Sequence, residues 1–182
     1  HAKIIDDRCI LCGHCTKVCP QNAKSVHSER ADVERLLRGG NVIASVAPSF
    51  VSSFNLQDFS VMRAALKSLG FADAEETSVG AREVTAQYKK LLEGGTFKNF
   101  ITSCCPAVNR MIELYYPQAL PYLAPVDTPM VAHAKMIRAC NKKAKVVFIG
   151  PCIAKKREGA EYGLDGVLIF EDLAAMFEEK GV

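Results

Sequence analysis

Four cysteines near the N-terminus form the pattern in this chain that points most directly to chemistry. They lie within eleven positions and are followed at once by a proline: Cys9, Cys12, Cys15, Cys19 and Pro20. Thiolates that are two residues apart reach different corners of an iron-sulfur cubane from one tight turn, and this spacing is the one found in bacterial ferredoxins. We therefore predict that the four cysteines bind a 4Fe-4S cluster.

Alternatives remain for this segment. Pairs of the C-x2-C type also bind zinc, but zinc sites use two pairs separated by a longer loop, which favours iron. His14 could be a ligand, although a solvated loop residue is the simpler interpretation. In two-cluster ferredoxins the fourth cysteine of a run binds the other cluster, and the sequence contains no second run. Either Cys19 completes a single cluster or a second motif lies outside this sequence.

The remaining composition is that of an ordinary globular protein. The chain has 182 residues, of which 49% are hydrophobic and 24% charged, and its net charge is +3. The basic residues are scattered, so nucleic acid is not expected as a partner. The sequence has neither a run of about 18 apolar residues nor the pattern of a secretory signal, so we expect a soluble, cytoplasmic protein without a membrane partner.

Short apolar runs alternate with helical periodicity after the cysteine segment. Strands are predicted over 42–46, 99–103, 145–149 and 167–170, and helices over 30–38, 59–69, 82–92, 107–116, 130–140 and 171–180. Such alternation predicts an α/β fold with a mostly parallel four-stranded sheet flanked by helices, preceded by a small ferredoxin-like iron-sulfur module. Gly39 and Gly40 end the first helix, so we divide the chain into 1–40 and 41–182.

The other four cysteines differ in their surroundings. Cys104 and Cys105 follow the predicted strand 99–103, and Cys152 follows the predicted strand 145–149. Ligands of open α/β sheets bind at the carboxyl ends of the strands, so we expect these cysteines to face a shared cleft. Cys140 lies among apolar residues of a predicted helix, and we predict a buried thiol without a functional role.

Two segments around these cysteines resemble a known family. Thr102 to Pro106 (TSCCP) and Pro151 to Glu158 (PCIAKKRE) are similar to the first two of three signatures of iron-only (FeFe) hydrogenases, and the N-terminal cysteine run precedes them in the family's order. The resemblance covers nearly the whole chain. It implies hydrogen chemistry, 2H⁺ + 2e⁻ ⇌ H₂, at an H-cluster, which is a 4Fe-4S cubane joined to a diiron unit.

The resemblance also implies roles for individual residues. Cys105 and Cys152 match ligands of the H-cluster cubane, and Cys104 matches the cysteine that transfers protons beside the diiron unit. Lys155 matches a lysine that hydrogen-bonds a cyanide ligand of that unit. Pro48 and Ser49 belong to a segment that resembles a loop in contact with the diiron unit.

Three departures from the family pattern change the expectation. No cysteine follows Cys152, so the third signature with its two further ligands is absent. Gly150 and Val108 stand where the family often has methionine and tryptophan, and these changes resemble divergent members with sensory roles. We therefore expect a fragment with one lobe of the H-cluster domain, inactive alone, whose H-cluster forms only in the full-length parent. The alternatives are a sensor of H₂ or redox state and a simple 4Fe-4S electron carrier.

The partners that follow from this resemblance are proteins. We expect the missing segments of the parent chain to complete the cleft. An electron carrier protein or a downstream signalling domain would then receive the electrons or the signal.

Overall fold

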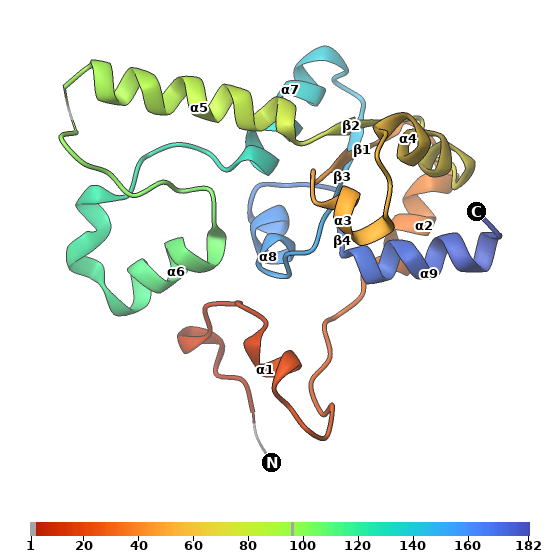
Figure 1. Cartoon of the computed structure of the whole chain (residues 1–182), viewed down its shortest axis with the longest axis horizontal. Coiled ribbons are helices and arrows are strands. Elements are labelled where there is room, and N and C mark those ends of the chain that lie inside the picture. The colour runs from red at the N-terminus through yellow and green to blue at the C-terminus, as the bar shows by residue number, and fades with distance from the viewer. Residues whose placement is uncertain (1–2, 96) are drawn as a thin grey trace.

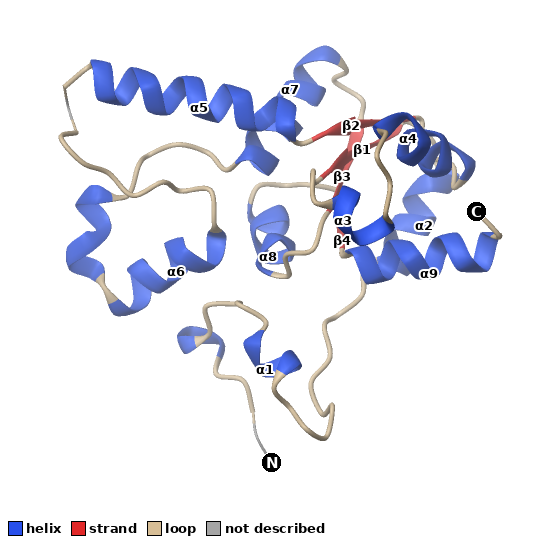
Figure 2. Ribbon diagram, in the orientation of Figure 1, coloured by secondary structure: helices blue, strands red, loops and turns tan. Residues whose placement is uncertain are grey.

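A parallel sheet of four strands forms the centre of the structure, a computed structural model that describes residues 3–95 and 97–182 (Figures 1 and 2). The strands are β1 (Val42–Val46), β2 (Asp73–Glu76), β3 (Lys145–Ile149) and β4 (Gly166–Leu168). Their order in the sheet is β2-β1-β3-β4, and every neighbouring pair is parallel. The predicted α/β fold with its four-stranded parallel sheet is confirmed.

Helices cover both faces of this sheet (Figure 2). The described residues form α1 (His14–Lys17), α2 (Arg30–Arg38), α3 (Phe50–Phe54), α4 (Phe59–Ser68), α5 (Ser78–Glu93), α6 (Pro106–Tyr115), α7 (Pro129–Cys140), α8 (Ala154–Glu161) and α9 (Phe170–Lys180). Pro106 and Pro129 occupy the first turns of α6 and α7, where a missing N–H costs no hydrogen bond. Thr128 caps α7 by accepting a hydrogen bond from the backbone N–H of Val131.

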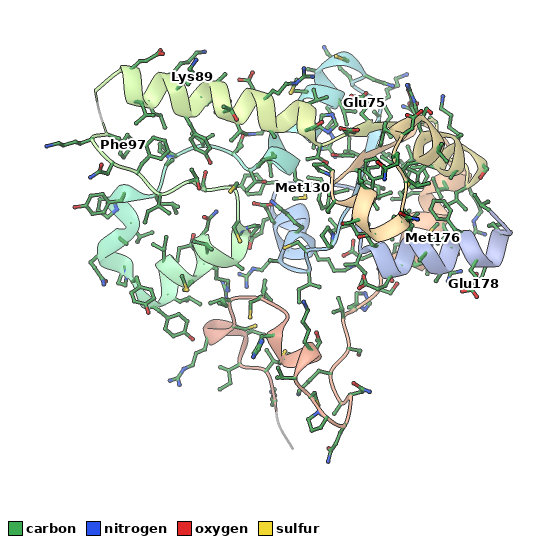
Figure 3. The ribbon with its side chains drawn as sticks, viewed as in Figure 1. Glu75, Lys89, Phe97, Met130, Met176 and Glu178 are labelled. Atoms are coloured by element: carbon green, nitrogen blue, oxygen red, sulfur yellow. The ribbon has the colours of Figure 1, made fainter. Side chains whose placement is uncertain are left out.

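Alternation along the strands sends side chains to two separate cores. Val42, Ala44 and Val46 of β1 pack with residues of α2, α4 and α9, including Met176. On the opposite face, Phe148 of β3 packs against Met130 of α7. The two methionines are labelled in Figure 3. The helix α5 packs on α7, on the same side of the sheet as the core of Phe148 and Met130.

One predicted strand is wrong. Residues 99–103 lie outside the sheet, and Ile101 makes only an isolated bridge to Leu123. The fourth strand is β2, which pairs with β1 at the edge of the sheet. It escaped prediction because it has the sequence DAEE, in which Ala74 is the one buried residue. Its three acidic residues leave no apolar run that a sequence pattern would detect.

The cysteine segment lies beside the domain rather than within it. Residues 3–17, with the turn Asp6–Arg8 and helix α1, lie below α6 and α8 in Figure 1. A connection without helix or strand, residues 18–29, then leads to α2. Its last part is attached to the sheet, because the Glu29 carboxylate accepts hydrogen bonds from Val167 N at 2.8 Å and from Lys156 Nζ at 3.4 Å.

Candidate iron-sulfur sites

The N-terminal cysteine loop has the backbone form of a tight wrapping turn. Leu11 and Gly13 both have positive φ angles, 60° and 76°. The backbone N–H of Leu11 points at Cys9 Sγ at 3.4 Å, and that of Ala23 points at Cys19 Sγ at 3.3 Å. Hydrogen bonds from Ala23 and Gln21 lower the pKa of the Cys19 thiol. Sulfurs that accept backbone N–H groups are prepared to carry the negative charge of a thiolate.

These residues fit an iron-sulfur cubane by their chemistry. The loop offers four thiols, and in a cubane each iron takes one of them. Within the described residues, no three or more His, Cys, Asp or Glu side chains converge as a site for a single metal ion. His14 lies at the start of α1 and is exposed, in agreement with its interpretation as a solvated residue.

The signature cysteines Cys105 and Cys152 both precede helices that lie next to each other. Cys105 is the N-cap of α6, and Cys152 comes directly before Ile153, the N-cap of α8. The two helices pack together, and Pro106 and Ala154 from their first turns line one cavity of about 120 Å³. The positive end of a helix dipole stabilises nearby negative charge. Both sulfurs lie at such ends, where a negatively charged metal cluster would be stabilised.

A buried polar network lies on the same helices. Lys155 Nζ donates to Glu158 Oε2 at 2.7 Å and lies 3.5 Å from the carbonyl oxygen of Cys104. Thr128 donates to the same Glu158 oxygen at 3.0 Å. Lys155 and Glu158 are only 8% and 6% exposed. The network therefore joins the second signature to the first, and it fixes the ammonium group beside Cys104.

The segment that carries Cys104 is held by side chains from α5 and α6 rather than by a strand. Tyr88 Oη accepts a hydrogen bond from Ser103 N at 3.0 Å, and Asn109 Nδ2 donates to Ser103 O at 2.8 Å. Ser103 Oγ also donates to the carbonyl of Val126. The prediction that Cys104 and Cys105 follow a sheet strand is therefore wrong, whereas Cys152 does follow β3. Cys104 itself is exposed.

Pro48 and Ser49 lie at the carboxyl end of β1, beside the end of β3. Ala47 N donates to Ile149 O at 2.8 Å, which brings the two strand ends together. A Cβ atom on Gly150 would lie 2.8 Å from the Phe148 ring and 3.0 Å from Ala47 Cβ. A side chain at position 150 would therefore require the Phe148 ring or Ala47 to move.

Cys140 is exposed, so the prediction of a buried thiol is wrong. The buried side chains of α7 run from Met130 to Ile137. Cys140 is the last residue of the helix, as predicted, but it lies beyond that buried stretch, so the apolar neighbours in the sequence do not cover it.

Contacts between the cysteine loop and the domain were not predicted. Arg110 of α6 donates to the carbonyl oxygens of Cys9 and Asp6, at 2.6 and 2.7 Å. A Cβ on Gly13 would lie 3.0 Å from Ile153 Cδ1, so the loop touches the residue after Cys152. The residues in these contacts are about 100 positions or more apart in the sequence. No local sequence pattern therefore indicates the contacts.

Comparisons with known proteins place two parts of the chain in described families. Residues 40–182 match the family model described as "Iron only hydrogenase large subunit, C-terminal domain". This chain belongs to the iron-only hydrogenase family. Residues 2–25 of this hydrogenase-family chain match the model "4Fe-4S binding domain". The chain is therefore an iron-sulfur protein with a 4Fe-4S motif, and the division at residues 40 and 41 remains a prediction.

Two curated relatives show how much of a hydrogenase the chain covers. It is 31% identical over 188 residues to the "Periplasmic [Fe] hydrogenase large subunit" of Nitratidesulfovibrio vulgaris, a match that covers 83% of this chain and 44% of the relative. It is 28% identical over 189 residues to "Iron hydrogenase 1" of Clostridium pasteurianum, with 85% of this chain and 33% of the relative covered. The chain thus spans less than half the length of these relatives.

One relative bears on the compartment of the protein. One relative is named as periplasmic, so the cytoplasmic location remains a prediction. Among the helices of the described residues, none has the length and apolar character required to cross a bilayer.

Proposed function

We propose that the full-length parent of this chain interconverts H₂ with protons and electrons, and that residues 1–182 supply its electron-transfer cubane and one lobe of its H-cluster domain. The observation that carries the proposal is the meeting of the two signatures. Lys155 lies three residues after Cys152 and places its ammonium group 3.5 Å from the Cys104 carbonyl. The first helical turns after Cys105 and Cys152 line one cavity.

The residues divide into ligands and supporting groups. Cys9, Cys12, Cys15 and Cys19 are proposed to hold the N-terminal 4Fe-4S cluster. Cys105 and Cys152 are proposed as two ligands of the H-cluster cubane, and the missing part of the parent supplies the other two. When bound, the H-cluster supplies the iron chemistry that cleaves H₂ into a hydride and a proton.

The chain's own residues handle the proton and the surroundings of the diiron unit. Cys104 is exposed, so its thiol is able to exchange a proton with solvent and with a base in the cleft. Lys155 is held in place by Glu158 and the Cys104 carbonyl, and it offers its third N–H group to an anionic ligand. Pro48 and Ser49, which follow β1 where its end meets the end of β3, are proposed to contact the diiron unit.

A sensory role is the second candidate. The observation that favours it is Gly150, which stands where the resemblance implies methionine and where any side chain would crowd Phe148 and Ala47. In that case a downstream signalling domain is the partner, whereas an enzyme exchanges electrons with a carrier protein. The third candidate, a simple electron carrier, requires that Cys104, Cys105 and Cys152 bind no metal.

The test uses the full-length parent purified without oxygen. H₂ oxidation is measured with oxidised viologen, together with the infrared bands of the carbonyl and cyanide ligands. We expect both signals, and we expect Cys152→Ser to abolish them while Cys140→Ser, at an exposed cysteine, retains them. Infrared bands with negligible H₂ oxidation favour the sensor. If the unaltered parent shows neither the infrared bands nor H₂ oxidation, the proposal that it binds an H-cluster is contradicted.

The isolated chain provides a complementary test. Residues 1–182 contain only two proposed ligands of the H-cluster cubane, so we expect no H₂ evolution from reduced viologen after cluster reconstitution. A clear rate of H₂ evolution from the isolated chain would contradict the proposal that it holds only two ligands of the H-cluster cubane.

A further inference from the structure

Helix α6 holds the cysteine loop through backbone carbonyls. Arg110 Nε donates to Cys9 O at 2.6 Å, and Arg110 Nη2 donates to Asp6 O at 2.7 Å. One turn and a half further along the helix, Tyr115 Oη donates to Arg8 O. Three carbonyls of one short turn therefore bind to one helix, and the same helix begins at Cys105.

The guanidinium group is suited to this contact because it is planar. Two of its N–H groups point in fixed directions, so it holds two carbonyls at once, which an ammonium group cannot do with the same geometry. Arg110 also lines the cavity that is shared by Leu11 of the cysteine loop and by the first turns of α6 and α8. The arginine therefore lies between the loop and the second site.

A second contact sets the approach of the loop to Cys152. Gly13 lies between Cys12 and Cys15, and a Cβ atom there would lie 3.0 Å from Ile153 Cδ1. The cysteine loop thus touches the residue that follows Cys152. Together, the Arg110 hydrogen bonds and the Gly13 contact fix the loop against the ends of α6 and α8.

We propose that Arg110 is a positioning residue for electron transfer, which holds the N-terminal cluster against the Cys105–Cys152 site and favours the reduced form of that cluster. This inference rests on the proposed function. One electron leaves the reduced N-terminal cluster and is accepted at the Cys105–Cys152 site of the parent, and no bond forms or breaks. A low-potential ferredoxin-type carrier replaces the electron, and dithionite does so in the test.

The sign of the effect follows from charge. Reduction adds a negative charge to the cluster, and a neighbouring cation stabilises the more negative form. Net charge and hydrogen bonding near a cluster set its reduction potential, so loss of the Arg110 cation shifts the equilibrium toward the oxidised form by roughly three- to tenfold. A tenfold shift of a one-electron couple corresponds to about 59 mV.

Two variants of Arg110 separate charge from position. Arg110→Gln removes the cation and the two-pronged contact, whereas Arg110→Lys keeps the cation and loses the fork. The matched control is Arg157→Gln, which removes a cation that lines the same cavity but pairs with Glu161 on its own helix. All variants are made in the 182-residue chain and reconstituted with iron and sulfide without oxygen.

Two readouts are measured on each variant. The first is the reduction potential of the cluster, from an EPR-monitored titration with dithionite. The second is hydrogen exchange at the amides of Arg8 and Cys9, which donate to Ile5 O and Asp6 O within the clamped turn. Exchange is also measured on the chain without a cluster.

The expected pattern differs for each variant. Arg110→Gln shifts the potential as stated, and Arg110→Lys keeps it within about twofold because the charge remains. Both speed exchange at Arg8 and Cys9 by roughly tenfold, since the loop loses its clamp. Arg157→Gln changes neither quantity by more than about twofold, because the Arg157 guanidinium is paired with Glu161 of its own helix.

Defined outcomes overturn the inference. If hydrogen exchange at Arg8 and Cys9 is unchanged in both Arg110 variants, Arg110 does not hold the loop. If the reduction potential is unchanged in Arg110→Gln, the arginine does not favour the reduced cluster. A shift in Arg157→Gln as large as that in Arg110→Gln shows that net charge alone acts. If the unaltered chain takes up no cubane, the proposed function fails instead, and the exchange measurement on the cluster-free chain still decides the clamp.

Discussion

Replacing Glu158 by glutamine tests whether the buried ion pair fixes the second signature. Glu158→Gln keeps the shape of the side chain and its ability to accept from Thr128, but it leaves the Lys155 ammonium without a counter-charge. Lys155 is 8% exposed, so water replaces the lost partner poorly. We expect a large loss of stability from this small chemical change.

The magnitude follows from the geometry. Lys155 Nζ and Glu158 Oε2 are 2.7 Å apart. At an effective dielectric constant of about 20, the attraction that is lost at such a distance is roughly 6 kcal/mol. The neutral amide oxygen still accepts a hydrogen bond from Lys155, which offsets part of that loss. A net cost of about 3 kcal/mol remains, at the lower end of the values for broken buried pairs.

The assay is urea unfolding of the chain, followed by circular dichroism. With a slope of about 2 kcal/mol per M, a cost of about 3 kcal/mol lowers the midpoint by about 1.5 M. The control is Glu161→Gln on the same helix, whose partner Arg157 is also 2.7 Å away but whose pair is about half exposed. That control costs less than about 0.5 kcal/mol. Equal midpoints for the two variants would refute the argument that burial makes the pair important.

Two further predictions concern the contact of α7 with its neighbours. A Cβ on Gly80 would lie 2.3 Å from the Pro129 carbonyl oxygen, so Gly80→Ala should cost about 2 kcal/mol and lower the melting temperature by roughly 4–8 °C in a thermal scan; an unchanged melting temperature would show that the helices separate freely. His133 is fully buried between Ser45 and Glu75, and burial lowers its pKa below the usual 6.5. Because the unfolded chain then binds more protons, stability should fall as the pH drops below 6.5, by at most about 1.4 kcal/mol per pH unit. His133→Gln should flatten this pH dependence in urea titrations at several pH values. An equally steep fall in the variant would assign the dependence to other groups.

Local patterns predicted the parts of the fold that local chemistry determines. The strands over 42–46 and 145–149 have the predicted bounds because both lie in the interior of the sheet and are buried except at Ile43 and Lys145. The edge strand β2 carries three acidic residues and was missed for that reason. The segment 99–103 has only two apolar residues, Phe100 and Ile101, and it lies outside the sheet, where Tyr88 and Asn109 bind Ser103.

The candidate sites show the same division between local and distant information. The cysteine run and the two signatures were visible because their residues are neighbours in the sequence. The partners of these residues come from far away, as Thr128 does for Glu158 and Arg110 for Cys9. Such pairs depend on how α6, α7 and α8 pack, and that packing is decided by the whole core rather than by any one segment.

Iron and sulfide analysis of the anaerobically reconstituted chain, with an EPR spectrum of the reduced protein, tests most directly whether the N-terminal cysteines bind a cubane. We expect about four irons and four sulfides per chain and the signal of a reduced 4Fe-4S cluster. Cys15→Ser should lose most of this iron, whereas Cys140→Ser should retain it. Bound zinc without sulfide, or a cluster that persists in Cys15→Ser and is lost in Cys152→Ser, would contradict the account.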